Sequence, residues 1–345
     1  MMTRALVFHG PRQLRWQDWS YTPPATGEVL VAVRAIGICG SDVHGYTGES
    51  GRRVPPLVMG HEATGEVVDL GPGVPPAWAG RRVIIQPFIW CDACDWCRSG
   101  QTNLCRNRRF MGATIDGAMA ERLVVPVRNL VPLPDQLSFL HGTLTEPSSV
   151  ALHAIHQAGD LAGKSVQIAG CGPIGLLTLL GVRRAGARCV VMTDVIQARL
   201  EVARELGAQV ALDPRDEDWR EQLSNAAGLA HEDFDAAFDA VGISATFQQA
   251  IGAVRPKGTV IAMGGWQTVS VNLGPLVARE ITVRGTFNFT PSEFEDACRI
   301  LGGEDSASLD RIITTARPLC EGAGVFERLA SNQAEHIKVV LTSTA

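Results

Sequence analysis

One short motif limits the folds open to this chain more than any other feature. It is Gly170-Cys171-Gly172-Pro173-Ile174-Gly175, a G-x-G-x-x-G pattern that follows a short apolar stretch and opens a helix-like segment. In that context the first glycine allows a tight turn, the second lets a pyrophosphate approach the backbone, and the third lets helix and strand pack closely. We therefore predict a dinucleotide-binding βα unit, with the phosphates at the N-terminus of the helix.

Strand-like and helix-like segments alternate around this motif, from about Glu146 onward. Repeated βα units predict a doubly wound parallel sheet with helices on both faces. The expected strands are Ser165–Gly170, Cys189–Thr193, Gln209–Leu212, Phe234–Ala240, Thr259–Met263 and Ile281–Thr286. The expected helices are Val150–Gln157, Pro173–Ala185, Ala198–Leu206 and Ser244–Val254. Beyond Thr286 we expect only one helix, Pro291–Leu301, and a final strand, His336–Leu341.

The N-terminal part, up to about Thr145, has a different pattern. Apolar or alternating segments of strand length are separated there by clusters of Gly and Pro, which is typical of a β-rich region. The whole chain has 345 residues, and at roughly 150 residues per domain this suggests two domains. The expected strands of the first part are Ala5–Phe8, Glu28–Ile36, Ala63–Leu70, Arg82–Gln86 and Glu121–Val125.

Composition excludes several classes of protein. The chain is 46% hydrophobic and 19% charged, which is the composition of a folded protein and argues against disorder. Its formal net charge of −5 gives no electrostatic reason to expect nucleic acid or an anionic membrane as a partner. No signal-peptide pattern and no apolar run of about 18 residues are visible. We therefore expect a cytoplasmic protein.

An acidic residue at the end of the next predicted strand indicates which cofactor binds. Asp194 stands 19 residues after Gly175, where a carboxylate can bind both ribose hydroxyls of NAD and would repel a 2′-phosphate. The alternative is an ordinary Gly-rich turn with Asp194 as a helix N-cap. Further candidates for cofactor contact, each with an equally plain structural alternative, are Arg199, Val241 and Gly264, and we also expect Thr286, Phe287 and Asn288 beside the cofactor.

Four of the nine cysteines lie within fifteen residues, at Cys91, Cys94, Cys97 and Cys105. Four thiolates at this spacing can surround Zn²⁺ tetrahedrally at about 2.3 Å and leave no open position, which is typical of a structural site. An iron–sulfur cluster is the rival, because it also takes four cysteines. We favour zinc, which would fix the lobe 87–109. The remaining isolated cysteines 171, 189, 298 and 320 are expected to be buried, inert thiols.

A second set of metal-binding side chains comes from three separate segments. These are Cys39-Gly40-Ser41-Asp42-Val43-His44, Gly60-His61-Glu62 and Thr145-Glu146-Pro147. Any one of them alone is more often structural than functional. Together they offer one sulfur, one nitrogen and exchangeable oxygen ligands, which is typical of a catalytic zinc site. Asp42 could hold the imidazole of His61 from behind.

These motifs, in this order and at these spacings, resemble the zinc-dependent medium-chain alcohol and polyol dehydrogenases over essentially the full chain. Glu146-Pro147 is similar to the polyol branch, which includes sorbitol, xylitol, L-idonate and threonine dehydrogenases. The resemblance implies an α/β fold, with a GroES-like β-barrel catalytic domain (1–149 and 288–345) and a Rossmann NAD-binding domain (150–287). It also implies that Cys39 and His61 bind catalytic zinc, with Glu62 or Glu146 as the carboxylate ligand.

The implied chemistry is hydride transfer from an alcohol to NAD. Bound zinc should acidify the alcohol, as it acidifies water, and the nicotinamide accepts the hydride. Ser41 could pass the released proton to the nicotinamide ribose, and His44 could hand it to solvent. The plainer interpretation of His44 is a solvated turn residue. A threonine-type alcohol dehydrogenase, a silent NAD-binding protein of the same fold and a zinc-free reductase are the competing functions.

The substrate class depends on one departure from the family. Asn288 stands where idonate and sorbitol dehydrogenases usually carry arginine, so the bidentate cationic contact is lost. We therefore favour a neutral polyol over a sugar acid as the substrate. Tyr46, Arg52 and Arg53, in the loop 45–54, are candidates for contact with the substrate, and either arginine could compensate for Asn288. The plainer interpretation is a solvated loop. We also expect a homodimer or homotetramer.

Overall fold

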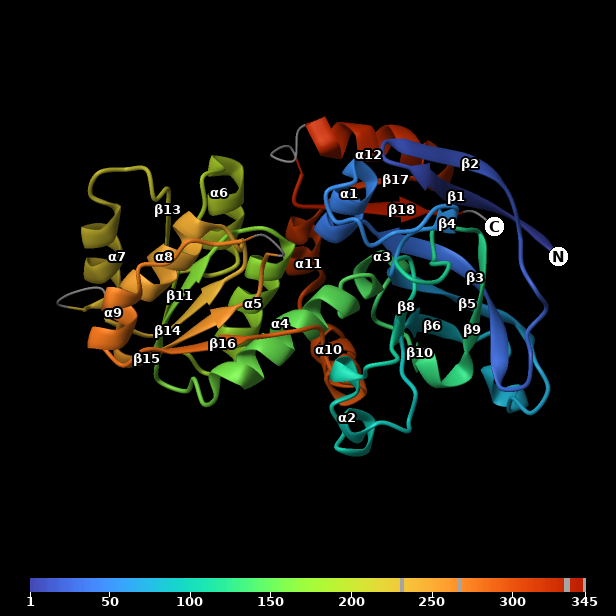
Figure 1. Ribbon diagram of the computed structural model, residues 1–345, viewed down its shortest axis with the longest axis horizontal. Helices are drawn as coiled ribbons and strands as arrows, with labels where there is room; N and C mark the ends of the chain where they lie inside the picture. Colours follow the sequence, from blue (N-terminus) through green and yellow to red (C-terminus); the bar gives the residue numbers. More distant parts are fainter. Residues whose placement is uncertain (230–232, 266–267, 332–335, 344–345) are drawn as a thin grey trace. The chain divides into compact units, whose positions relative to one another are not determined.

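The computed structural model describes residues 1–229, 233–265, 268–331 and 336–343 (Figure 1). The chain forms two compact units. Unit 1 comprises Met1–Glu146 and Thr290–Ala345, and unit 2 comprises Pro147–Phe289. None of the helices in the described part has both the length and the hydropathy needed to cross a bilayer.

Unit 2 contains a six-stranded, entirely parallel sheet in the order β13-β12-β11-β14-β15-β16. The first strand of the unit lies in the middle, and the chain builds outward from it in both directions. The order therefore reverses between β11 and β14, which is where dinucleotides bind in folds of this class. The strands are β11 (Ser165–Ala169), β12 (Cys189–Thr193), β13 (Val210–Leu212), β14 (Phe234–Asp239), β15 (Val254–Ala262) and β16 (Thr282–Gly285).

Burial explains why β11 and β12 are mostly apolar. Every residue of β11 and β12 is buried, which requires helices on both faces of the sheet. On β14, Phe234 and Phe238 are fully buried and supply much of the core volume. The helices of this unit are α4 (Thr145–Ala158, which begins at the unit boundary), α5 (Pro173–Arg184), α6 (Gln197–Glu205), α7 (Trp219–Ala227), α8 (Ser244–Ala253) and α9 (Leu273–Ala278).

Unit 1 is dominated by a larger, mostly antiparallel sheet in the order β10-β6-β5-β3-β18-β17, with β9 also paired to β3. A three-stranded sheet, β2-β1-β4, and a two-stranded ribbon, β7-β8, accompany it. The strands are β1 (Met2–Gly10), β2 (Gln13–Ser20), β3 (Glu28–Gly37), β4 (Leu57–Val58), β5 (Glu62–Leu70), β6 (Arg82–Ile85), β7 (Phe88–Ile89), β8 (Arg109–Phe110), β9 (Arg122–Pro126), β10 (Leu130–Pro132), β17 (Ile313–Pro318) and β18 (Lys338–Thr342).

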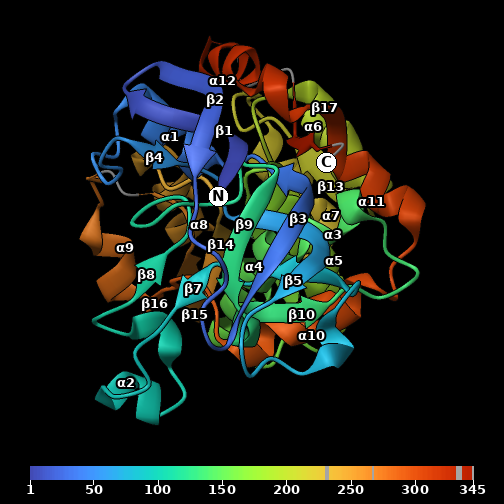
Figure 2. The same ribbon diagram turned by 90° about the vertical axis from the view of Figure 1, so that its right-hand side faces the viewer.

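Strand β3 is the central strand of unit 1, and Figure 2 shows it among its neighbours. One edge pairs with β5 along its length. The other edge pairs with β9 at its start and with β18 at its end, where Leu341 lies opposite Ile36. The C-terminal segment therefore belongs to the same sheet as the N-terminal strands. The fully buried Val29, Val31 and Val33 anchor β3 in the core.

The helices of unit 1 are α1 (Gly40–Thr47), α2 (Asp95–Arg98), α3 (Phe139–Gly142), α10 (Pro291–Leu301), α11 (Ser306–Ile312) and α12 (Gly322–Ser331). Local sequence explains the start of α10 well. Thr290 accepts a hydrogen bond from the Glu293 backbone N–H, and the Glu293 carboxylate accepts one from Thr290 N, while Pro291 occupies the first turn. This is a capping box, which satisfies backbone donors at the helix start.

The expectation of only one helix and one strand after Thr286 was wrong, because α11, β17 and α12 also lie there. Strand β17 alternates between half-buried and exposed residues and carries little apolar signal. Helix α12 contains two glycines, which lower helix propensity. The polar strand β2 was also missed, since only Leu14 within it is buried. Cys320 is exposed, so its expected burial was wrong, whereas cysteines 171, 189 and 298 are buried.

Candidate metal centres and dinucleotide site

The four clustered cysteines converge at one point of unit 1. The Sγ–Sγ distances are 3.5 Å for Cys91–Cys105, 3.5 Å for Cys94–Cys97 and 3.9 Å for Cys91–Cys97. A tetrahedron with Zn–S bonds of about 2.3 Å has sulfurs roughly 3.8 Å apart. The four sulfurs therefore fit a closed tetrahedral zinc site, and they form one of two metal-capable groups in the described part of the chain.

The surroundings of these sulfurs shift the pKa values of the thiols in different directions. Backbone N–H groups of Ala93 and Cys94 lower the pKa of Cys91 to about 6. Desolvation, together with the neighbouring sulfurs, raises the pKa of Cys97 to about 12. Four thiolates cannot share this small volume without a compensating cation, and Zn²⁺ supplies that charge.

The second metal-capable group consists of Cys39, His61 and Glu62, whose ligand atoms all lie within 4.8 Å of one another. Cys39 is the N-cap of α1, so its side chain stands at the start of a helix. His61 and Glu62 stand at the start of β5, and Glu62 is paired with Gly37 on β3. A side chain on Gly37 would put a Cβ 2.0 Å from Glu62 Oε2, so glycine is required there for the carboxylate to enter the site.

Asp42 supports this group from behind, as the sequence predicts. It is fully buried, and its Oδ1 lies 3.4 Å from His61 Nδ1 and 2.7 Å from Arg53 Nη2. Burial by itself would raise the Asp42 pKa, but His61, Arg53 and the Cys39 backbone N–H outweigh it and leave the pKa at about 2. An ionised Asp42 fixes the ring orientation of His61.

Arg53 has a different role from the one expected. It is buried, and it donates to the Gly112 and Ser41 carbonyls as well as to Asp42. The interpretation of Arg53 as a solvated loop residue was therefore wrong. Tyr46 is also buried and donates its hydroxyl to Glu327 at 2.7 Å, so it too serves the interior of unit 1. Arg52 is exposed.

A buried lysine that sequence reasoning missed faces Glu62. Lys338, on β18, is 2% exposed, donates to the Ile38 carbonyl at 3.1 Å and forms an ion pair with Glu62. Burial lowers its pKa, but the Glu62 charge more than offsets this, so the net shift is upward. A buried charge persists only when paired. The available signal was a lysine next to the apolar run 339–341 at the end of the chain.

Glu146 approaches the same group from the first turn of α4. It is 5% exposed, and burial, reinforced by the Glu62 charge and partly offset by His61, raises its pKa to about 7. Its carboxylate is outside the set of mutually close ligand atoms. Of the two carboxylates named by the sequence, Glu62 is thus the one that lies with Cys39 and His61.

The two proton-handling candidates both lie on α1. Ser41 is half-buried, and its backbone carbonyl accepts from Arg53. His44 is exposed in the last turn, and its Nδ1 lies 2.6 Å from Glu49 Oε2. The hydrogen bond from His44 lowers the pKa of the exposed Glu49 carboxyl. Any proton leaving through His44 therefore reaches a carboxylate that the sequence did not single out.

The glycine motif of unit 2 has the geometry that its sequence predicts. Gly170 directly follows β11 and has a φ of +98°, a conformation that favours glycine. A Cβ on Gly175 would lie 1.9 Å from the Gly170 carbonyl oxygen, while one on Gly172 would meet nothing within 4 Å. Gly172 is the N-cap of α5, and Pro173 occupies the first turn. The helix N-terminus is thus accessible to an anion.

Asp194 is tied to this turn directly. It follows β12, and its carboxylate accepts from Cys171 N at 2.7 Å and from Ile196 N at 2.9 Å. The N-cap of α6 is Ile196, so the alternative in which Asp194 is that cap was wrong. Arg199 lies on α6, shortly after Asp194 in sequence.

The other expected contacts lie at the carboxyl ends of neighbouring strands. Asp239 Oδ1 accepts from Val241 N and Gly242 N after β14. A Cβ on Gly242 would lie 2.2 Å from the backbone of Gly264, after β15, so close loop packing already accounts for glycine at both positions. After β16 come Thr286, Phe287 and Asn288; Asn288 has φ +55°.

Two family descriptions match this sequence. The family description "Alcohol dehydrogenase GroES-like domain" matches residues 25–135, and "Zinc-binding dehydrogenase" matches residues 173–302. A sorbitol dehydrogenase from Ovis aries is 34% identical over 94% of this chain and 92% of its own length. The chain belongs to the zinc-containing medium-chain dehydrogenases. It is a zinc-dependent alcohol/polyol dehydrogenase, and its family acts on polyols and sugar acids.

Two further relatives of this dehydrogenase act on sugar acids. An L-idonate 5-dehydrogenase from Vitis vinifera is 37% identical over 78% of this chain and 76% of its own length. An L-galactonate-5-dehydrogenase from Escherichia coli K12 is 33% identical over 98% of both chains. These matches confirm the predicted family and the polyol branch.

Solved structures agree on the fold and on the cofactors. A protein from Sinorhizobium meliloti 1021 with bound NADP has a TM-score of 0.89 at 30% identity, and covers 99% of this chain and 100% of its own. An alcohol dehydrogenase from E. coli CFT073 with NADH has the same TM-score at 25% identity, covering 99% of each chain. The predicted α/β fold, the dependence on zinc and a nicotinamide dinucleotide cofactor are thus confirmed.

Proposed function

We propose that this dehydrogenase oxidises a secondary hydroxyl of a neutral sugar alcohol to the ketone, with NAD as hydride acceptor. The observation that carries the proposal is the convergence of Cys39, His61 and Glu62 within 4.8 Å. When bound there, zinc polarises the alcohol oxygen and lowers its pKa. Glu62 is proposed as the direct carboxylate ligand, and Glu146 as a carboxylate behind the ligand set.

The residues around this group have separate roles: they orient the ligands, move the proton and bind the cofactor. Asp42 holds His61 in one orientation, and Lys338 holds the Glu62 carboxylate. Ser41 relays the proton of the substrate hydroxyl to the nicotinamide ribose, donating its own hydroxyl proton as it accepts that one. His44, paired with Glu49, releases the proton to solvent. At the cofactor, Gly170, Gly172, Pro173, Ile174 and Gly175 present the phosphate-binding turn, and Asp194 binds the ribose.

The asparagine at position 288 and the contacts of Arg53 favour a neutral polyol over a sugar acid as the substrate. Recognition of a carboxylate would call for a guanidinium fork. Asn288 cannot provide one, and Arg53, one of the two candidate substitutes, uses its fork on Asp42, Ser41 and Gly112. The relatives that act on L-idonate and L-galactonate make a sugar acid the second candidate.

Initial rates of nicotinamide reduction test the substrate class. Sorbitol, xylitol, galactitol, L-idonate, D-gluconate, threonine and ethanol are each measured with NAD and with NADP at alkaline pH. We expect the highest kcat/KM on a neutral polyol with NAD. Preference for L-idonate or gluconate would contradict the argument from Asn288, and preference for threonine or ethanol would contradict the polyol assignment. A zinc-loaded enzyme silent on all seven would leave the proposal without support.

Replacing Asp194 tests the choice of cofactor. Asp194→Ser keeps an acceptor for Cys171 N but removes the charge that repels a 2′-phosphate. The ratio of kcat/KM with NADP to that with NAD should rise by about tenfold or more, on the scale of one hydrogen bond to a charged group. Asp213→Ser, after the neighbouring strand β13, is the matched control and should leave the ratio unchanged. No gain with NADP would rule out Asp194 as the ribose-binding residue.

Replacing Ser41 tests the proton path. Ser41→Ala should lower kcat by ~10²-fold or more, which is the scale of general acid–base catalysis. Ser20→Ala, an exposed serine on β2, serves as the control and should retain wild-type kcat. Near-normal turnover of Ser41→Ala at every pH would exclude the relay.

We also propose a cytoplasmic homodimer. Four closely spaced cysteines in metal-binding geometry need a reducing compartment.

Strand β16 ends the sheet of unit 2, all four of its residues are exposed, and Leu273 and Val277 on α9 are 61% and 70% exposed. An exposed edge strand beside apolar side chains is suited to pairing with a second copy. Light scattering should give twice the chain mass, and Leu273→Lys together with Val277→Lys should lower it; a wild-type monomer would refute the dimer.

A further inference from the structure

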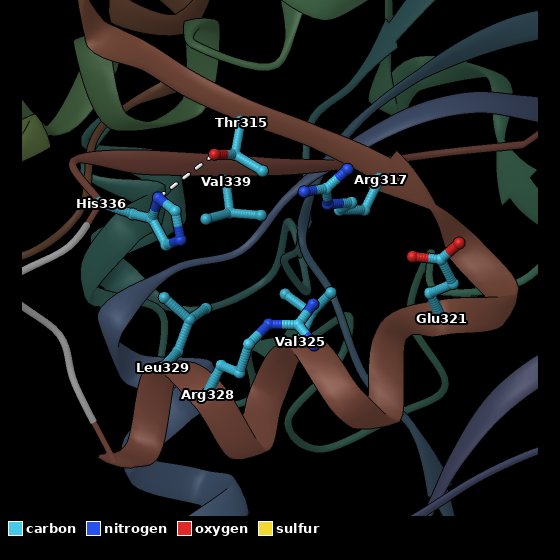
Figure 3. A pocket seen from close by; sticks show the side chains of 8 residues that line it. All are labelled: Thr315, Arg317, Glu321, Val325, Arg328, Leu329, His336 and Val339. Atoms are coloured by element: carbon cyan, nitrogen blue, oxygen red, sulfur yellow. Dashed lines mark hydrogen bonds between the residues drawn. The ribbon is translucent and has the colours of Figure 1, made fainter.

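A cavity in unit 1 lies apart from both metal-ligand sets. It has a volume of about 370 Å³ and is bordered by strands β17 and β18 and by helix α12 (Figure 3). Pockets that hold small ligands have volumes of about 300–1,000 Å³, so this one is suited to a small molecule. None of its lining residues belongs to the proposed reaction machinery; they are Thr315, Arg317, Glu321, Val325, Arg328, Leu329, His336 and Val339.

Strand β18 separates this cavity from the catalytic ligands. Successive side chains of a strand point to opposite faces. Lys338 extends to Glu62, and Val339, the next residue, lines the cavity. The Val339 carbonyl accepts from Ile38 N at 2.9 Å, directly before Cys39. The cavity is thus a separate site that shares a strand with the catalytic centre.

The floor of the cavity is apolar and one wall is polar. Val325 and Leu329 on α12 and Val339 on β18 are all buried. On β17, the Thr315 hydroxyl lies 3.2 Å from His336 Nδ1, which Figure 3 shows at one end of the cavity. A ligand here would place an apolar body on the floor and polar atoms toward the rim.

Two arginines reach over this floor from opposite elements. Arg317 extends from β17 and Arg328 from α12, and Figure 3 shows both at the same cavity. Neither guanidinium has an ion pair or a hydrogen bond to another side chain or carbonyl within the residues that the structure describes. By contrast, Arg12 pairs with Glu327, the neighbour of Arg328, at 2.6 Å. Glu321, also at the rim, is not within ion-pair distance of either arginine.

We propose that this cavity binds a small phosphate monoester with an apolar organic group. Arg317 and Arg328 would each donate to the phosphoryl oxygens, since guanidinium forks match phosphate geometry and two forks suit a dianion with three terminal oxygens. The Thr315 hydroxyl already donates to the Thr314 carbonyl at 2.8 Å, so the two guanidinium groups would carry the recognition of the phosphate. Val325, Leu329 and Val339 would contact the organic group. Glu321 would disfavour ligands with additional negative charge at its side of the rim.

Calorimetric titration with phenyl phosphate tests the site. The protein is the zinc-loaded full chain, saturated with NAD so that the dinucleotide phosphates are already in place. We expect one phenyl phosphate per chain, at least about fivefold tighter than inorganic phosphate because of the apolar floor, and no measurable binding of phenol. Equal affinity for phenyl and inorganic phosphate would reduce the site to non-specific anion attraction and overturn the proposal, as would the absence of saturable binding.

Two variants locate the binding. Arg317→Gln and Arg328→Gln should each weaken phenyl phosphate binding by about tenfold or more, the scale of a lost charge-assisted contact. Arg122→Gln, an exposed arginine of β9 in the same unit, should bind as wild type. All three variants should keep the wild-type kcat, which shows that they fold. Wild-type affinity in either cavity variant, or equal weakening in the control, would place the ligand elsewhere.

Discussion

His61→Ala should lower kcat by about a thousandfold or more and reduce the zinc content from two ions per chain to one. His61 contributes the only nitrogen of the Cys39–His61–Glu62 group. Its loss leaves two ligands, too few to hold the ion in a catalytic site. Lewis-acid stabilisation is worth several kcal/mol, and each 1.36 kcal/mol corresponds to a factor of ten in rate.

Metal analysis and kinetics of the same preparation check this prediction. His9→Ala is the matched control, since His9 is a half-buried histidine of unit 1 that bonds Gln17 and should keep both zinc ions and the wild-type rate. Retention of two ions by His61→Ala would remove His61 from the ligand set. Loss of zinc with little loss of rate would refute a catalytic role for the metal at this position.

Cys94→Ser should remove the other zinc ion and unfold the lobe around it. The lobe has few other means of stabilisation: α2 is a single short turn with no buried residue, and β7 and β8 are two residues each. Structural zinc contributes about 10–16 kcal/mol of apparent binding free energy in small domains. Most of the local stability therefore depends on the four sulfurs.

Limited proteolysis and metal analysis detect the expected change. Cleavage within 87–109 should become rapid in Cys94→Ser, with one zinc ion remaining in the chain. Cys320→Ser removes an exposed cysteine outside the lobe and should resist cleavage as wild type does. A protease-resistant Cys94→Ser protein with two zinc ions would show that the four cysteines do not hold a metal.

Lys338 and Arg53 change how the catalytic group is understood. Each is a buried cation that contacts one carboxylate, Lys338 with Glu62 and Arg53 with Asp42. The carboxylates near the ligand set are thus individually compensated, except Glu146, whose pKa burial raises to about 7. The site combines three nearby carboxylates with two lysine or arginine cations, an arrangement that the separate motifs did not indicate.

Several features follow from local sequence because local chemistry requires them. The turn at Gly170 needs glycine for its positive φ and for the approach of Gly175 to the Gly170 carbonyl, so motif and structure coincide. Four thiolates at close spacing can meet without help from distant residues. The buried strands β11 and β12 are mostly apolar, because helices cover both faces of the sheet.

The tertiary structure decided which charged residues from distant segments contact the catalytic group. The pairing of Leu341 with Ile36 carries the C-terminal strand to β3 and brings Lys338 to Glu62, across more than 270 positions in sequence. By sequence alone Arg53 is a loop residue, and only the folded structure shows that it is buried against Asp42. The sequence alone determined which atoms can bind zinc and a dinucleotide, because those require particular residue types. Only the fold decided which charges compensate them, because burial and proximity depend on strand register and not on local pattern.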